Sequence, residues 1–177
     1  MRKFITVIAL MIVFFFIYIL QVNVFGTFTI AGIKPNLFVI YVLFIGLFAN
    51  QTLGISLGVI FGLIIDFLYG KTIGTSAVML CVIGYLGSYF DKNFSKEIKL
   101  TIIFMIAGAT FIYELGTYFL NSIILEFDRE FFHFMKIVLI EIVYNVLLTI
   151  ILYPMIQKIG YTIDRNFKKN NILTRYF

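Results

Sequence analysis

A seventeen-residue apolar run, residues 52–68, carries a glycine at every fourth position and an acid near its end. The glycines are Gly54, Gly58 and Gly62, and the acid is Asp66. The run has the length of a short membrane-spanning helix. In lipid, small residues spaced four apart let two helix backbones approach closely, and van der Waals contact then holds the helices together. The run therefore predicts a membrane helix with one close-packing face.

The composition extends this conclusion to the whole chain. Hydrophobic residues make up 62% of the 177 residues and charged residues only 13%. A soluble domain of this size cannot bury so much apolar surface. A spanning helix takes about 20 residues, so there is room for five or six spans and almost nothing else. We expect an all-α fold, a polytopic membrane helical bundle.

Six spans are expected, at about residues 4–22, 35–49, 52–68, 73–90, 100–120 and 132–156. With the N-terminus inside, most of the 14 Lys and Arg residues fall on the cytoplasmic side, as the positive-inside rule requires. These cytoplasmic residues are Arg2, Lys3, Lys92, Lys96, Lys99, Lys158, Arg165, Lys168, Lys169 and Arg175. We therefore expect a multi-pass protein of the bacterial plasma membrane with both termini cytoplasmic. Residues 1–157 would form the membrane domain, and residues 158–177 a basic cytoplasmic tail attracted to anionic membrane lipid.

The second and third spans are short and meet at Asn50-Gln51. This pair is either a tight turn between two helices or a polar dent in one long helix. A single crossing here would move most of the basic residues outside, which favours the turn. Pro35 and Asn36 fit a helix start, because Pro is tolerated in a first turn and Asn can cap.

Four further glycines lie between residues 70 and 87. Gly70 and Gly74 flank a short polar stretch and permit a tight turn between spans. Gly84 and Gly87 give the following span a second close-contact patch. Helix packing is the expected role of all four.

Three acids fall within the expected spans: Asp66, Glu114 and Glu141. A carboxylate at the bilayer centre costs roughly 2.5–3.5 kcal/mol, so such residues usually face protein or water. Asp66 continues the row of glycines and so borders the packed face. It is either a polar clamp to another helix, in this chain or in a partner, or an interface acid that reaches water.

The other two acids each have polar neighbours on the same helix face. Tyr144 and Asn145 follow Glu141 at i+3 and i+4, and Tyr118 follows Glu114 at i+4. We expect a network inside the bundle that joins Glu114 to Tyr144 or Asn145. A structural network is the favoured interpretation, with a proton relay as the alternative.

Residues for familiar catalytic chemistry are missing. His133 is the only histidine and Cys81 the only cysteine, so neither a two-histidine metal site nor an intrachain disulfide can form. No nucleophile elbow or phosphate-binding loop is present. The basic residues lie at membrane edges, which does not indicate nucleic-acid binding. The sequence predicts a protein that is not an enzyme and holds no cofactor or metal.

The order of several short motifs resembles the MreD family of bacterial rod shape-determining membrane proteins. The motifs are Pro35-Asn-Leu, Gly46, Gly54, Gly58, Gly62-Leu63, Asp66, Gly70, Gly74 and Gly84-Tyr85-Leu86-Gly87. They cover roughly residues 33–90. The resemblance implies a non-enzymatic subunit of the cell-wall elongation machinery that binds an MreC-like single-span protein. It would act alongside MreB, RodA and a class B penicillin-binding protein. The resemblance also implies a fold similar to the substrate-binding subunits of energy-coupling-factor transporters.

Two functions follow from these features. In the first, the chain is a scaffold, and the stripe of Gly54, Gly58 and Gly62 or the external loops dock a partner. In the alternative, it is the substrate-binding membrane subunit of a vitamin or small-molecule transporter. That protein would use a polar cavity near Asp66, Glu114, Tyr118 and Glu141.

Overall fold

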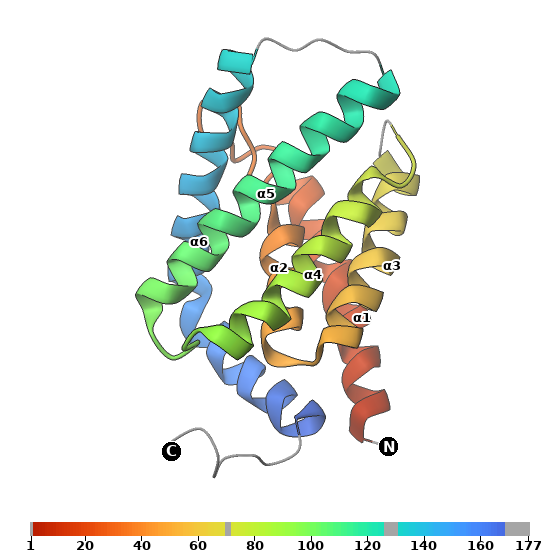
Figure 1. The fold of residues 1–177 in the computed structure, drawn as a ribbon, viewed down its shortest axis with the longest axis vertical. Coiled ribbons are helices and arrows are strands. Elements are labelled where there is room, and N and C mark those ends of the chain that lie inside the picture. Colours follow the sequence, from red (N-terminus) through yellow and green to blue (C-terminus); the bar gives the residue numbers. More distant parts are fainter. Residues whose placement is uncertain (1, 70–71, 126–130, 169–177) are drawn as a thin grey trace.

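The computed structural model describes residues 2–69, 72–125 and 131–168. In this part of the chain the fold is all-helical, which confirms the expected class (Figure 1). A short π-helical segment, η1, extends the first α-helix. The bounds are α1 Arg2–Ile19, η1 Leu20–Val24, α2 Leu37–Phe48, α3 Gln51–Tyr69, α4 Thr75–Asn93, α5 Lys99–Leu125 and α6 Phe131–Phe167.

Four helical segments of the described chain are long and apolar enough to cross a membrane. They are Arg2–Val24, Gln51–Leu68, Lys99–Ile124 and Phe131–Phe167. α2 is apolar but shorter, and α4 ends in a polar turn that includes Asp91 and Lys92. The structure thus describes an integral membrane protein, with a helix at each of the six expected positions.

The short helix α2 lies in the middle of the bundle. Every one of its twelve residues except Tyr41 is buried, and it packs against α1, α3, α4, α5 and α6. A helix that is apolar on all sides is typical of such a central position. At 1.5 Å per residue α2 is only about 18 Å long, against a hydrocarbon core of about 30 Å. Because protein surrounds it, α2 does not have to match the bilayer by itself.

The chain turns sharply between α2 and α3. α2 ends at Phe48 and α3 begins at Gln51. The Asn50 side-chain oxygen accepts a hydrogen bond from the backbone N–H of Leu53 at 2.9 Å, which satisfies one free amide of the first turn of α3. Of the two interpretations of Asn50-Gln51, the structure has the tight turn.

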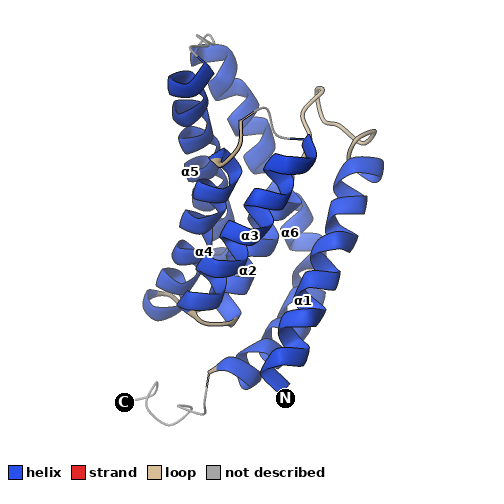
Figure 2. Cartoon of the chain, turned by 90° about the vertical axis from the view of Figure 1, so that its right-hand side faces the viewer, coloured by secondary structure: helices blue, strands red, loops and turns tan. Residues whose placement is uncertain are grey.

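α1 lies on one flank of the bundle and α5 on the other (Figure 2). α1 packs through aromatic residues: the ring of Phe14 stacks on that of Phe61 in α3, with 4.1 Å between centroids. The hydroxyl of Tyr41 donates to the backbone oxygen of Leu10 at 2.6 Å, so a polar group also joins α1 to α2. The rest of the α1 surface is apolar and exposed.

α6 is longer than any expected span. It has 37 residues and contains Pro154, which removes one helix hydrogen bond. Beyond Pro154 the helix continues to Phe167, and the side chain of Asn166 donates to the Thr6 hydroxyl of α1 at 3.0 Å. The end of α6 therefore lies beside the start of α1, at one end of the bundle (Figure 1).

Candidate functional site

The glycine row of α3 packs against α4 of the same chain. A methyl group added at Gly54, Gly58 or Gly62 would come closer than 3.0 Å to backbone atoms. Gly58 faces the backbone of Leu80, and Gly62 faces that of Ala77. The close-packing face predicted from the sequence is therefore already occupied by α4.

Three glycines from three helices meet at one crossing. A Cβ on Gly54 of α3 would lie 2.7 Å from the Gly84 oxygen of α4 and 2.9 Å from the Gly46 Cα of α2. Gly87 of α4 likewise faces the backbone of α2. Next to this crossing, the Ser88 hydroxyl donates to the Gly46 oxygen at 2.8 Å. The crossing fixes α2, α3 and α4 together through backbone contact.

Asp66 binds the first turn of α4. Its Oδ2 accepts from the backbone N–H of Gly74 at 2.8 Å and of Ser76 at 3.1 Å, and it also accepts from Ala77. These amides have no partner within the helix, and a negative charge at a helix N-terminus is favourable. Gly74 has a φ of 99°, a conformation that favours glycine. Asp66 is thus a clamp within the chain. Gly70 lies outside the described residues.

Asn36 is the N-cap of α2. It follows Pro35 directly, and its side-chain oxygen accepts a hydrogen bond from the Val39 N–H at 3.3 Å. Its backbone N–H donates to the Asn145 side chain of α6 at 2.8 Å. The amide group of Asn145 donates in turn to the Thr110 hydroxyl of α5 at 3.0 Å. This chain of bonds links the start of α2 to both long helices.

The carboxyl groups of Glu114 on α5 and Glu141 on α6 lie against each other. Glu141 also interacts with the side chain of Asn145. Two carboxylates at this range repel each other strongly unless a proton or a cation lies between them. Glu141 is 7% exposed, and its Oε1 atom is buried without a hydrogen-bond partner.

The expected network differs in its connections. Glu114 meets Glu141, whereas the sequence joined Glu114 to Tyr144 or Asn145. The Tyr144 hydroxyl donates to the backbone oxygen of Phe28 at 3.0 Å, in the segment after η1. The Tyr118 ring stacks on Phe134 with 4.3 Å between centroids. The Tyr144 hydroxyl is therefore bonded outside the pair of acids.

A cavity of about 220 Å³ opens beside Glu141. It is lined by residues of η1 and of α2 to α6, together with Lys34, Pro35 and Asn36. The helix residues are Gln21, Phe38, Ile65, Ser76, Tyr113 and Glu141. Asp66 and Tyr118 are not among its lining residues, although the sequence placed both near a polar cavity.

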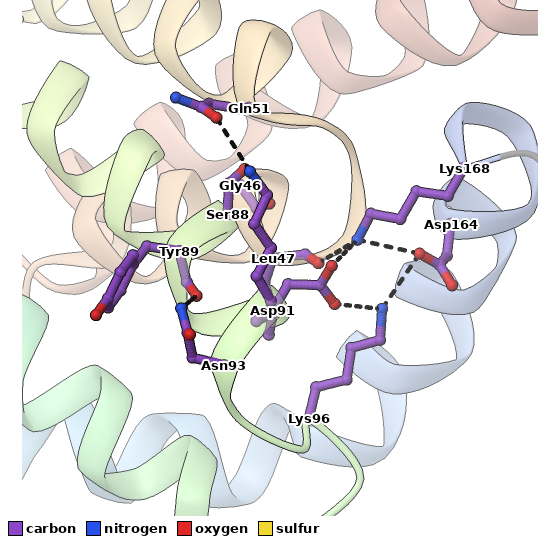
Figure 3. Close-up of polar contacts among 11 residues, drawn as sticks. Gly46, Leu47, Gln51, Ser88, Tyr89, Asp91, Asn93, Lys96, Asp164 and Lys168 are labelled. Carbon is purple, nitrogen blue, oxygen red and sulfur yellow. Dashed lines mark hydrogen bonds and ion pairs between the residues drawn. The ribbon is translucent and has the colours of Figure 1, made fainter. Parts of the chain in front are cut away.

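Four charged side chains form a cluster at the other end of the bundle (Figure 3). Asp91 at the end of α4 forms ion pairs with Lys96 at 2.9 Å and with Lys168 at 2.7 Å. Asp164 of α6 lies 3.2 Å from both lysines. The Lys168 ammonium also donates to the backbone oxygen of Leu47 in α2 at 2.8 Å. The cluster therefore ties the end of α6 to α2 and α4.

The charge of this cluster determines the pKa of Asp91, which lies just beyond the expected span 73–90. Burial raises the pKa of this carboxyl. The hydrogen bonds and positive charges of Lys168 and Lys96 outweigh that effect, so the pKa falls below its ordinary value of 3.8. Asp91 is therefore ionised in the folded protein at neutral pH.

Several polar residues of these sites were not singled out from the sequence. The Gln21 side chain donates to the Pro35 oxygen at 2.7 Å and accepts from the Leu37 N–H at 3.0 Å, which joins η1 to α2. Tyr113 interacts with the side chains of Ser76 and Asn36. Gln21 is a polar residue at the end of an apolar run, and that position is the signal that would have identified it.

In the described part of the chain, no three His, Cys, Asp or Glu side chains lie together as metal ligands. What the geometry offers is helix packing, a polar cavity and surfaces for other membrane helices.

The family model of the rod shape-determining protein MreD matches residues 1–161. No curated protein and no solved structure gives a significant match. The match covers most of the chain, including α5 and most of α6, where no sequence motif could be aligned with the family. This chain belongs to the MreD family of rod shape-determining membrane proteins.

Proposed function

We propose that the chain is a non-enzymatic scaffold subunit of the cell-wall elongation complex and binds an MreC-like single-span protein. MreB, RodA and a class B penicillin-binding protein would be further members of the assembly. Membership of the MreD family supports a role in the rod-shape system. In this proposal both termini are cytoplasmic, so the cluster of Asp91, Lys96, Asp164 and Lys168 lies at the cytoplasmic end.

The partner surface must lie away from the glycine row of α3, because α4 covers that row. One other helical glycine is left without a packing role. A Cβ on Gly108 of α5 would meet nothing within 4 Å. Glycine in a helix interior costs roughly 1 kcal/mol relative to alanine, and here no contact with the described residues explains it.

The surroundings of Gly108 fit an approaching helix. Phe104 and Phe111 are exposed on the same flank of α5, with exposed fractions of 68% and 39%. Residues four and three positions away from Gly108 lie on the same helix face, so the glycine forms a notch between two large rings. A small residue on a membrane helix lets a second backbone approach closely. We assign this notch to the spanning helix of the MreC-like partner, and it is the observation that carries the proposal.

The test compares co-purification of the partner with three variants of the full chain. Gly108→Leu fills the notch and should abolish recovery of the partner without lowering the melting temperature. Val78→Phe, which enlarges an exposed side chain on α4, is the control and should retain the partner. Gly58→Leu should lose the partner only because the bundle no longer folds. Normal recovery with Gly108→Leu would place the partner elsewhere and refute the assignment.

The cavity beside Glu141 favours the alternative function as a second candidate. A substrate-binding subunit similar to those of energy-coupling-factor transporters would need such a cavity. It would co-purify with paired ATPase subunits and a coupling protein. Recovery of wall-synthesis proteins and no ATPases would decide for the scaffold.

A further inference from the structure

Two glutamates form a polar contact between α5 and α6. The Glu141 carboxyl of α6 is hydrogen-bonded to the Glu114 carboxyl of α5 and to the Asn145 side chain. Glu141 is buried, whereas Glu114 is only partly buried. Ionised carboxyl groups only accept hydrogen bonds, so two of them cannot bond to each other. The contact therefore requires a proton on one of the two groups.

The hydrogen bonds of Glu141 run through one of its two oxygens. The Oε1 atom is buried and has no hydrogen-bond partner, so both bonds are made by Oε2. The Asn145 oxygen accepts from the Asn36 N–H at 2.8 Å, and the Asn145 amide group is left to donate to Oε2. An oxygen that accepts one bond and donates another is the hydroxyl of a protonated carboxyl.

The alternative position of the proton is less favourable. If Glu114 carried it, Glu141 would be a buried carboxylate whose Oε1 atom has no donor. An unsatisfied buried group costs more when it is charged than when it is neutral. The more buried Glu141 is thus the neutral member of the pair, and the partly buried Glu114 accepts its hydrogen bond.

The other charged groups around the cavity leave this pair uncompensated. Lys34 lines the cavity and is exposed, and no ion pair of the described residues joins it to Glu141. Asp66 of α3 is bonded to amides at the start of α4. Tyr113 of α5 lies beside both glutamates and interacts with Ser76 of α4. η1 and α2 contribute only uncharged side chains to the cavity.

We infer that Glu114 and Glu141 form a proton-binding site, in which Glu141 Oε2 holds one proton and donates it to Glu114. The proton joins α5 to α6, and Asn145 connects the site to the start of α2. Loss of the proton would leave two carboxylates in contact, and their repulsion would weaken this junction. The packing of α5 on α6 therefore depends on protonation. The inference is independent of the partner surface at Gly108.

The experiment is infrared spectroscopy of the full-length protein in neutral detergent, with the side-chain carboxyl carbon of glutamate isotope-labelled. A protonated carboxyl absorbs at higher frequency than a carboxylate, and the label separates glutamate from aspartate. We expect a band of protonated glutamate in the wild type at neutral pH. Glu141→Gln should lose this band. Glu97→Gln, which replaces an exposed acid outside the cavity, is the control and should retain it.

Glu114→Gln tests whether the proton belongs to the pair. A neighbouring negative charge helps a carboxyl group to keep its proton, so this variant should lose the band at a lower pH than the wild type. Loss at the same pH in both proteins would show that burial alone holds the proton, and would overturn the shared site.

The wild-type spectrum decides the first point even if a variant does not fold. If it contains no protonated glutamate at neutral pH, both groups are ionised and the inference is wrong. The inference also fails if the band persists in Glu141→Gln, because the proton then lies on another glutamate.

Discussion

The two sides of the bundle are held together by different means. α3 and α4 meet backbone to backbone through glycines, with Asp66 bonded to the amides at the start of α4. α5 and α6 meet through polar side chains beside a cavity, and the Asn145 amide of α6 donates to the Thr110 hydroxyl of α5. On the first side, Asp66 and the glycines of α3 and α4 are all used within the described chain. On the second, Gly108 of α5 has no packing contact with the described residues.

This difference explains why a conspicuous motif need not be an interaction site. Glycines four apart mark close helix contact, but they do not say whose helix makes the contact. The row of α3 is satisfied by α4, and so it is a fold determinant. Gly108 in α5 has no packing contact with the described residues, so it is the helical glycine that the fold leaves unexplained.

The largest loss of folding stability is expected from Gly84→Leu. Gly84 lies against Gly54 of α3 and Gly46 of α2, so no side chain fits without moving backbone. We expect a loss of at least about 3 kcal/mol, at the upper end of overpacking effects. The measurement is the fraction of monodisperse protein and its melting temperature in detergent. Gly108→Leu is the matched control and should stay near wild type. Equal damage from both variants would remove the distinction between the two sides.

A smaller loss of folding stability is expected from Asp66→Ala. The mutation frees several amides of the first turn of α4, and losing a helix cap costs about 0.5–2 kcal/mol. The loss should be local, so hydrogen exchange at Ser76 and Ala77 should accelerate while α5 is unaffected. Asp66→Asn keeps one acceptor and should lie between wild type and alanine. Unchanged exchange at Ser76 would show that these hydrogen bonds are not formed.

The charged cluster predicts that the melting temperature depends on pH in the acid range. The pKa of Asp91 is lower in the folded protein than its ordinary value of 3.8. The carboxylate therefore stabilises the fold above that value, and the contribution is lost as the pH falls through the lower, folded pKa. Melting temperature should drop over this acid range in wild type. Hydrogen bonds to charged groups are worth about 1.5–3 kcal/mol, and exposure of Lys168 reduces that figure.

Asp91→Asn isolates this group from the other acids. It should melt lower than wild type at neutral pH and show a shallower fall in acid. Lys92→Gln removes an exposed lysine next to the cluster and is the matched control. If the melting temperature of Asp91→Asn falls with pH as steeply as that of the wild type, the pH dependence comes from other carboxyl groups.

The sequence was informative where periodicity determines structure. Six apolar segments gave six helices, and the step-of-four glycines identified a real packing face. The partners of buried polar groups were harder to predict, because they depend on how each helix is oriented about its own axis in the bundle. Glu114 and Glu141 are 27 positions apart in the sequence, and nothing in either helix says that they meet. The helical segment 158–167 also gave no signal, because its contacts come from other elements.

The smallest expected effect is that of Gly108→Ala, and its sign separates packing from function. A methyl group here meets nothing in the chain, and alanine favours a helix over glycine by roughly 1 kcal/mol. The isolated protein should therefore become slightly more stable, by less than about 1 kcal/mol in melting experiments. The same methyl group at Gly54 should destabilise it, because the Gly84 oxygen lies 2.7 Å from its position. A partner helix seated at Gly108 would be pushed outward, so co-purification should weaken while stability rises. If stability falls instead, Gly108 has a contact within the bundle, and the exposed notch on α5 does not exist.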